Sequence, residues 1–291
     1  MTYGIKSDSY ISKHLGPNVT YSENVQDRSD IEEYIRLKCK EYGVESSFDV
    51  TAQENPHFKT INYTTYAGML IIHPLEFGQT LFQMYDAKAD NLPNAGHIDY
   101  LRDKVMSGKM QKYNVRNNVH DDFEAVAVLC GHNKFKQHID SKKLDQLVKK
   151  YGKRLAIKPH PISEPRLLEH LKIYSEFSTL LDINDSLYDA IHNSKKVYTT
   201  HISETAITGL LAGKEVEPID HYQQRFCGSF GHLNHFCFTE DKPLETLTTI
   251  FASPKSGVIC PEVDVNWSDK IDQYFSYTLS RRNKLKGYYN G

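Results

Sequence analysis

Short apolar segments alternate with amphipathic segments through residues 121–220. The apolar segments predict short buried strands; they are EAVAVLCG, RLAIK, STLLDI, KVYTTH and EVEPID. The segments between them predict helices; they are DSKKLDQLVKKYGK, SEPRLLEHLKIY (with Ser163 as its cap), NDSLYDAIHNS and SETAITGLLAG. Strands that alternate with helices across short loops predict a doubly wound parallel sheet, with helices on both faces.

The first 120 residues alternate less regularly and predict a smaller α/β domain. DRSDIEEYIRLKCKEYG predicts a helix that stops at Gly43, and EFGQTLFQMYDAK predicts another, with strands in SFDVTA and FKTINYTTYAGMLIIHP. The polar, aperiodic stretch at 112–122 is typical of a domain junction. WSDKIDQYFSYTLSRRNK predicts a terminal helix. We therefore expect domains at 1–118 and 119–265, followed by a helix and basic tail at 266–291.

Composition narrows the class of protein. The chain has 291 residues, of which 39% are hydrophobic and 25% charged, with a formal net charge of −2, as expected of a folded protein without a strongly basic module. No apolar run is long enough to span a bilayer, and MTYGIKSDSY lacks the features of a signal peptide. The 5 cysteines include no CxxC pair. We expect a cytoplasmic protein without membrane insertion.

Polar side chains follow several of the predicted strands. Ligands of open parallel sheets bind beyond the carboxyl ends of the strands. The residues expected there are Gly131, His132 and Asn133, then Lys158, His160 and Ser163, then Thr199, Thr200, His201, Ser203 and Glu204. Helix N-termini flanked by Lys or His suit phosphate groups, so this edge predicts a site for a nucleotide.

His160 lies between Pro159 and Pro161, which hold the backbone extended. This geometry predicts an imidazole that points into the crevice, where it can bind a phosphate or a ribose hydroxyl. The alternative is that His160 caps the next helix and that Lys158 is a solvated strand end. GxGxxG, P-loop, GxSxG and HExxH motifs are absent from the sequence, and His232 and His235 have no convincing companion ligand for a metal.

The run KPHP, followed by VYTTHISETAITGLLAGKEVEPID, resembles the C-terminal half of GT-B glycosyltransferases. The likeness is to bacterial capsule and lipopolysaccharide transferases of the Kdo-transferase-like and polysialyltransferase-like families, and it covers about residues 124–220. The matching positions are His160 and Pro161 in a His-Pro element, Ser203 and Glu204 at a helix start, and Gly213 and Lys214 in a GK turn. Relatives often have paired serines before this helix, whereas this chain has Thr199, Thr200, His201, Ile202 and Ser203 there.

The resemblance implies a GT-B-like fold, in which two Rossmann-like domains face a cleft. It implies that residues 119–265 bind a nucleotide-sugar donor and that residues 1–118 face the acceptor. The expected donor-binding residues are Gly131, His132, Lys158, His160, Thr200, Ser203 and Glu204. In IIHPLEFGQ, His73 and Glu76 follow an apolar strand and are the candidate catalytic residues. The sequence has no clear DxD pair beside the cleft, so we expect transfer without a divalent metal or other cofactor.

The segment SYTLSRRNKLKGYYNG carries Arg281, Arg282 and Lys284 without an acidic residue. It is either a solvated helix end or a contact for an acceptor, which is DNA or a polysaccharide. The tyrosine-rich chain also looks like phage transferases that add sugars to hydroxylated bases of DNA, which would place it in the host cytoplasm. A capsule or lipopolysaccharide transferase, a nucleotide-sugar epimerase or hydrolase, and a non-catalytic polyanion-binding module are the alternatives.

Overall fold

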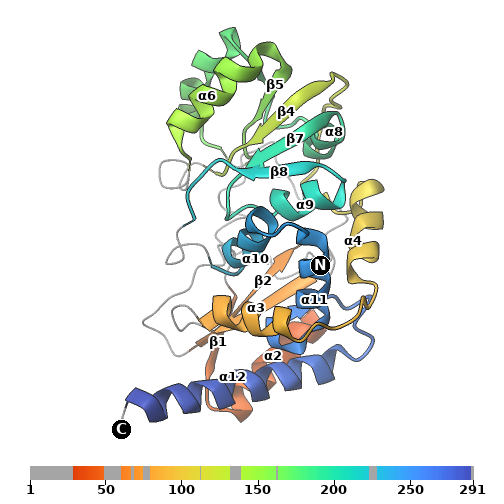
Figure 1. Ribbon diagram of the computed structural model, residues 1–291, viewed down its shortest axis with the longest axis vertical. Helices are drawn as coiled ribbons and strands as arrows, with labels where there is room; N and C mark the ends of the chain where they lie inside the picture. The colour runs from red at the N-terminus through yellow and green to blue at the C-terminus, as the bar shows by residue number, and fades with distance from the viewer. Residues whose placement is uncertain are drawn as a thin grey trace.

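The computed structural model describes residues 29–48, 60–66, 69–74, 79–111, 113–131, 139–161, 163–222 and 228–289. Two β-sheets lie at different heights along its long axis, with helices between and around them (Figure 1). No helix in this part of the chain is long and apolar enough to cross a membrane.

The first sheet has five strands, all parallel, in the order β6-β5-β4-β7-β8. The strands are β4 (Phe123–Val128), β5 (Leu155–Lys158), β6 (Thr179–Leu180), β7 (Ser194–Thr199) and β8 (Glu215–Pro218). Each overlaps a segment that the apolar pattern predicted, so the parallel sheet is confirmed; β7 begins two residues earlier than predicted, at Ser194. The chain starts at the central strand β4, extends to β5 and β6, and then crosses to β7 and β8. The strand order therefore reverses between β4 and β7, which makes this the topological switch point.

Helices cover both faces of the parallel sheet. On one face are α6 (Ser141–Tyr151) and α7 (Pro165–Leu171), whose leucines pack with Ala125, Ala127 and Ile157. On the other face are α8 (Leu187–His192) and α9 (Thr205–Leu211); the former packs with Val126 and Val197. The short helices η1 (Gly152–Arg154) and η2 (Lys172–Glu176) complete this unit. The parallel sheet flanked by helices is compatible with a Rossmann-like unit.

The second sheet is mixed, with four strands in the order β1-β2-β3-β9. The strands are β1 (Glu45–Phe48), β2 (Thr60–Tyr66), β3 (Met69–Pro74) and β9 (Val258–Ile259). Only β1 and β2 are parallel, because β3 runs antiparallel to both β2 and β9. The described residues thus form one parallel sheet and one mixed sheet. The expected pair of Rossmann-like domains facing a cleft is not confirmed.

Helices from both ends of the chain surround the mixed sheet. They are α2 (Ser29–Glu41), α3 (Gln79–Ala89), α4 (His97–Met106), α10 (Gly228–Thr239), α11 (Pro243–Ala252), η4 (Pro254–Ser256) and α12 (Trp267–Tyr289). Figure 1 shows the blue C-terminal helices beside the orange N-terminal strands. Residues 243–265, which we expected in the nucleotide-binding domain, supply α11 and β9 to this second unit.

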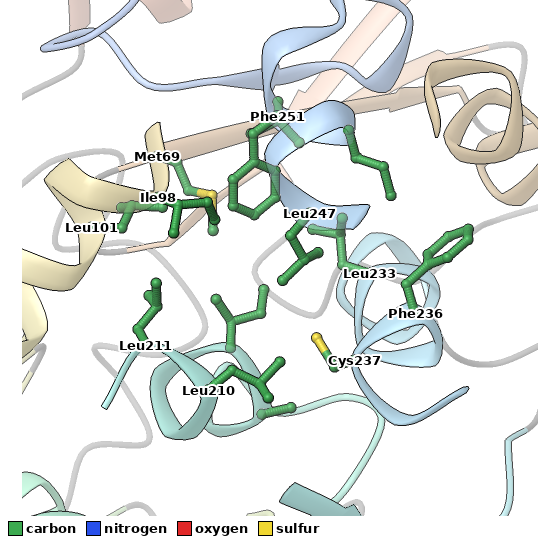
Figure 2. Close-up of a cluster of buried hydrophobic side chains, with 14 of the residues drawn as sticks. Met69, Ile98, Leu101, Leu210, Leu211, Leu233, Phe236, Cys237, Leu247 and Phe251 are labelled. Carbon is green, nitrogen blue, oxygen red and sulfur yellow. The ribbon is translucent and has the colours of Figure 1, made fainter. Parts of the chain in front are cut away.

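We call residues 123–220 the parallel-sheet unit, and residues 29–111 with 228–289 the mixed-sheet unit. One hydrophobic core joins them, because Leu210 and Leu211 of α9 pack with side chains from α4, α10 and α11. Figure 2 shows these groups meeting, among them Leu101, Leu233 and Leu247. The contact between the units is a continuous buried core at this point.

Candidate functional site

The carboxyl ends of β4, β5 and β7 bring three polar loops to one edge of the parallel sheet. Lys158 pairs with Val128, and Tyr198 pairs with Ala127, so Thr199 lies level with Val128 and Lys158. This edge contains the topological switch point, where open α/β sheets bind their ligands. The described residues that the sequence placed here are Gly131, Lys158, His160, Thr200, Ser203 and Glu204, and the parallel topology brings them to this one edge.

Three hydroxyl groups at this edge are buried without a hydrogen-bond partner. The Oγ atom of Ser163 and the Oγ1 atoms of Thr199 and Thr200 have none among the described residues, and both threonines are 0% exposed. Buried polar groups are almost always paired in folded proteins, because an unpaired one loses its bonds to water without replacement. These hydroxyls come from the ends of β5 and β7, on either side of β4. We take them as the centre of the candidate site.

Lys158 is 2% exposed and reaches inward from the end of β5. Its Nζ atom donates to the carbonyl oxygens of Pro159 at 2.9 Å and of Ile183 at 3.1 Å. Burial lowers the pKa of this amine to about 8, although Asp185 and Asp182 oppose the shift. The amine therefore braces the loops that follow β5 and β6. Its role toward a ligand stays a prediction.

His160 lies half-buried in the turn after β5, where its carbonyl oxygen accepts from the backbone N–H of Ser163 at 2.9 Å. Its ring meets the ring of Tyr113 edge to face, with 5.8 Å between centroids. The N-cap of α7 is Glu164, and no side chain caps it. The expectation that Ser163 caps this helix is therefore wrong, and so is the alternative that His160 does. Pro165 stands in the first turn as predicted.

The loop 200–204, between β7 and α9, is held by two buried side chains. Asp220, just beyond β8, accepts from the backbone N–H of His201 with both oxygens, at 3.2 and 3.0 Å, and its Oδ1 lies 2.7 Å from the ring Nδ1 of His201. A carboxylate can only accept, so Nδ1 carries the proton. From α10, the amide of Asn234 donates to the carbonyl oxygens of His201 at 2.5 Å and of Ser203 at 2.6 Å.

Further imidazoles lie behind this loop. The ring of Tyr222 stacks on His235 with 4.3 Å between centroids, and its hydroxyl lies 2.8 Å from Nδ1 of His232. Burial lowers the pKa of His235, and the nearby His201 and His232 lower it further. No cluster of three or more His, Cys, Asp or Glu side chains suited to a metal ion occurs in the part of the chain that the structure describes.

Ser203 and Glu204 form the start of α9. The Oγ atom of Ser203 accepts from the backbone N–H of Thr205 at 3.2 Å and donates to its Oγ1 at 2.9 Å. Glu204 occupies the N-cap without a side-chain cap bond. Burial, and then the charge of Glu204, raises the pKa of Tyr188. The side-chain bonds of Ser203 are thus local to the helix start, and donor binding by both residues stays a prediction.

Gly213 and Lys214, which match the GK turn, end α9. Gly213 has a φ of 73°, a conformation that glycine adopts without strain. The Nζ atom of Lys214 donates to the carbonyl oxygen of His192, the last residue of α8, at 2.7 Å. This turn joins two helices of the unit.

The remaining predicted residues are distributed over the rest of the chain. His73 lies in β3 opposite Asn62, with its side chain outside the description, while Glu76 and His132 lie outside the described residues altogether. Arg281 pairs with the carboxylate of Asp86, and its guanidinium lies 5.5 Å from the ring centroid of Phe82. The described side chains of α12 end at Arg281, and those of Arg282 and Lys284 lie outside the described part of the structure.

Comparison with protein-family models gives no match, and comparison with curated proteins gives none either. The functional assignment therefore rests on the residues themselves.

Sequence reasoning missed two residues of this site, Asp220 and Asn234. Asp220 is the last residue of the predicted strand segment EVEPID, and that position at the end of a parallel strand is a usable signal for an edge residue. Asn234 comes from α10, which the sequence did not predict as a helix, so no signal pointed to it.

Proposed function

We propose that this protein is a nucleotide-sugar-dependent glycosyltransferase whose donor binds at the carboxyl edge of the parallel-sheet unit. The observation that carries the proposal is the set of buried, unpartnered hydroxyls of Ser163, Thr199 and Thr200 at the switch point. Hydroxyls can donate to phosphate oxygens, and a bound phosphate would supply the partners that these groups lack. The KPHP run and the helix start at Ser203 add the likeness to GT-B transferases.

In such a reaction the leaving group is the nucleotide phosphate, which gains negative charge as the bond to the sugar breaks. Hydroxyls aimed at that charge, with His160 beside them, would stabilise it in the transition state. An inverting reaction also needs a base for the acceptor hydroxyl, for which His73 and Glu76 stay the candidates. Because Thr199 and Thr200 are 0% exposed, the donor reaches their hydroxyls only when the segments that cover them move aside.

The acceptor is a hydroxyl group on DNA or on a polysaccharide. A DNA acceptor calls for cationic contacts, and the charge of Arg281 is already balanced by Asp86. This pairing favours a polysaccharide acceptor over a DNA acceptor bound through Arg281. It also weighs against a non-catalytic polyanion-binding module at the same place.

The test is thermal stabilisation by a panel of UDP, CMP and GDP sugars. We expect one class of donor to raise the melting temperature of the wild type. Thr200→Val, which keeps the shape and removes the hydroxyl, should lose most of that shift. Thr249→Val on α11 is the matched control, because its hydroxyl only bonds back to Glu245 within the helix.

No stabilisation by any of these donors would contradict the proposal. If a donor binds, incubation with hydroxylated DNA or with an oligosaccharide identifies the acceptor. Conversion of the donor sugar without any acceptor would indicate an epimerase or hydrolase instead.

A further inference from the structure

The loop 200–204 has an unusual distribution of hydrogen bonds. Its backbone groups have buried hydrogen-bond partners. Asp220 accepts from the N–H of His201, and Asn234 donates to the carbonyl oxygens of His201 and Ser203. The carbonyl oxygen of Thr200 accepts from the N–H of Ser203 at 3.1 Å. In the same stretch, the side-chain hydroxyls of Thr199 and Thr200 have no partner among the described residues.

The groups that hold this loop are themselves buried. Asp220 is 6% exposed and Asn234 is 0% exposed. Burying a carboxylate or an amide is unfavourable unless its bonds are replaced, and here the replacements come mainly from the loop. A loop that only connects β7 to α9 needs no buried partners, because water can form hydrogen bonds with its backbone. Two buried polar side chains from different elements instead fix it in one conformation.

We propose that Asp220 and Asn234 are positioning residues, which hold loop 200–204 so that the hydroxyls of Thr199 and Thr200 stay available to the ligand at the switch point. This inference rests on the proposed function. Neither residue touches the ligand itself; Asn234 acts through the backbone of the loop, and Asp220 acts through the backbone N–H and the ring of His201. Asn234 also ties the loop to α10, whose Leu233 and Phe236 belong to the core shared by the two units.

The variants that test the inference keep side-chain shape and change hydrogen bonding together with the formal charge of the side chain. Asn234→Asp replaces the donating amide with a carboxylate, which cannot donate to two carbonyl oxygens. Asp220→Asn removes one of the two accepting oxygens. The control is Asn94→Asp, which makes the same chemical change at an exposed site. Its side chain can still accept from the N–H of Gly96, and the bond that it loses, from its amide to Asp99 at 3.0 Å, is on the surface.

The measurements are the affinity for CMP, UDP and GDP by calorimetry and the rate of backbone hydrogen exchange across residues 199–207. We expect Asn234→Asp and Asp220→Asn to lower the affinity for the nucleotide by about tenfold or more. Exchange should become faster within the loop, and Asn94→Asp should change neither quantity. With a donor substrate, KM should rise more than kcat falls, because a saturating donor restores the binding conformation of the loop.

Wild-type affinity in both variants would overturn the inference. So would a lower melting temperature with unchanged affinity, since that pattern indicates a purely structural role. If the wild type binds none of the three nucleotides, the proposed function is what fails. The exchange data then decide the inference by themselves: faster exchange confined to the loop supports the positioning role, and unchanged exchange overturns it.

Discussion

Both units bury a lysine, but the two amines have different partners. In the mixed-sheet unit, Lys270 donates to both carboxylate oxygens of Asp264, at 2.9 and 3.0 Å, and to the carbonyl oxygen of Phe251 at 2.7 Å. Asp264 also accepts from His97 at 2.9 Å and from the N–H of Cys260 at 2.7 Å. In the parallel-sheet unit, the hydrogen bonds of Lys158 within the described residues go to carbonyl oxygens.

The difference separates a structural network from a site. The network around Asp264 gives both charges direct partners and ties α4, α12 and the segment after β9 together. Among the described residues, the edge of the parallel sheet instead carries an amine that bonds only carbonyl oxygens, together with three hydroxyls without partners. The mixed-sheet unit also has buried atoms without partners, such as Nδ1 of His97 and Oγ1 of Thr80, but its buried charges are paired. Local rules of polar satisfaction are broken mainly where a protein has to bind something. Four predictions test this comparison.

Gly257→Ala should break the mixed sheet and give the largest loss. Gly257 has a φ of 72°, and a Cβ atom there would lie 2.1 Å from the carbonyl oxygen of Ile72. That strand cannot retreat easily, because the N–H of Ile72 donates to the carbonyl oxygen of Gly257 at 2.8 Å. We expect the free energy of unfolding to fall by about 4 kcal/mol or more, measured by urea denaturation.

Gly43→Ala is the matched control for this change. Gly43 also has a positive φ, of 62°, but a Cβ atom there meets nothing within 4 Å. The strained dihedral alone should cost about 1 kcal/mol. Equal losses at both glycines would mean that the approach of β9 to β3 is looser than described.

Asp264→Asn should cost about 3 to 4 kcal/mol, because it leaves the charge of Lys270 buried without a counter-charge. Although burial raises it, the net pKa of Asp264 is lowered by the bond from His97, the charge of Lys270 and the N–H of Cys260. A lowered folded-state pKa adds stability above the ordinary Asp pKa of about 3.9, and acidification through the folded-state pKa removes it. Wild type should therefore lose more stability than the variant between pH 5 and pH 2. Parallel acid-unfolding curves would argue against this network.

Lys158→Met should change the pH dependence of stability by about 1 to 2 kcal/mol between pH 8 and pH 9.5. Burial lowers the pKa of this amine to about 8, from an ordinary value of 10.5. The unfolded chain thus holds the proton more tightly in this range, so wild-type stability should rise with pH. The variant should lack that rise in urea-unfolding series. An identical pH slope in both proteins would show that the amine keeps an ordinary pKa.

Thr199→Val should have the smallest effect on stability, within about 1 kcal/mol and in the stabilising direction, because it removes a buried hydroxyl without a partner. The same change should weaken nucleotide binding. Thr208→Val is the control, since the hydroxyl of Thr208 bonds the carbonyl oxygen of Glu204 at 3.2 Å and its loss should destabilise slightly. A clear loss of stability in Thr199→Val would reveal an unrecognised bond to that hydroxyl.

The two units also differ in how far the sequence predicts them. In the parallel-sheet unit, strands and helices alternate along the chain, so local apolar periodicity was enough to find every strand. In the mixed-sheet unit, the pairing of Ile71 with Val258 joins positions far apart in the sequence. No local pattern encodes such a contact, and β9, α4, α10 and α11 were accordingly not predicted. The helices α2, α3 and α12 were predicted from their own segments.

The candidate site shows the same division. Lys158, Thr200 and Ser203 were placed at the edge from the sequence, since each lies at or just beyond the end of a predicted strand. Their bonding was not predictable, because it depends on packing in three dimensions. The inward turn of Lys158 depends on the loop after β6, and the support of loop 200–204 by Asn234 depends on a helix beyond the sheet.

The position of β9 at the edge of β3 has a consequence for biosynthesis. The segment 123–220 contains all the strands of its own sheet, so it can assemble as soon as it has left the ribosome. The N-terminal strands emerge earlier, yet their sheet stays incomplete until residues 258–259 and the helix after them have been translated. We expect residues 123–220 to fold first, and the N-terminal strands to complete their sheet only after β9 and α12 have been synthesised.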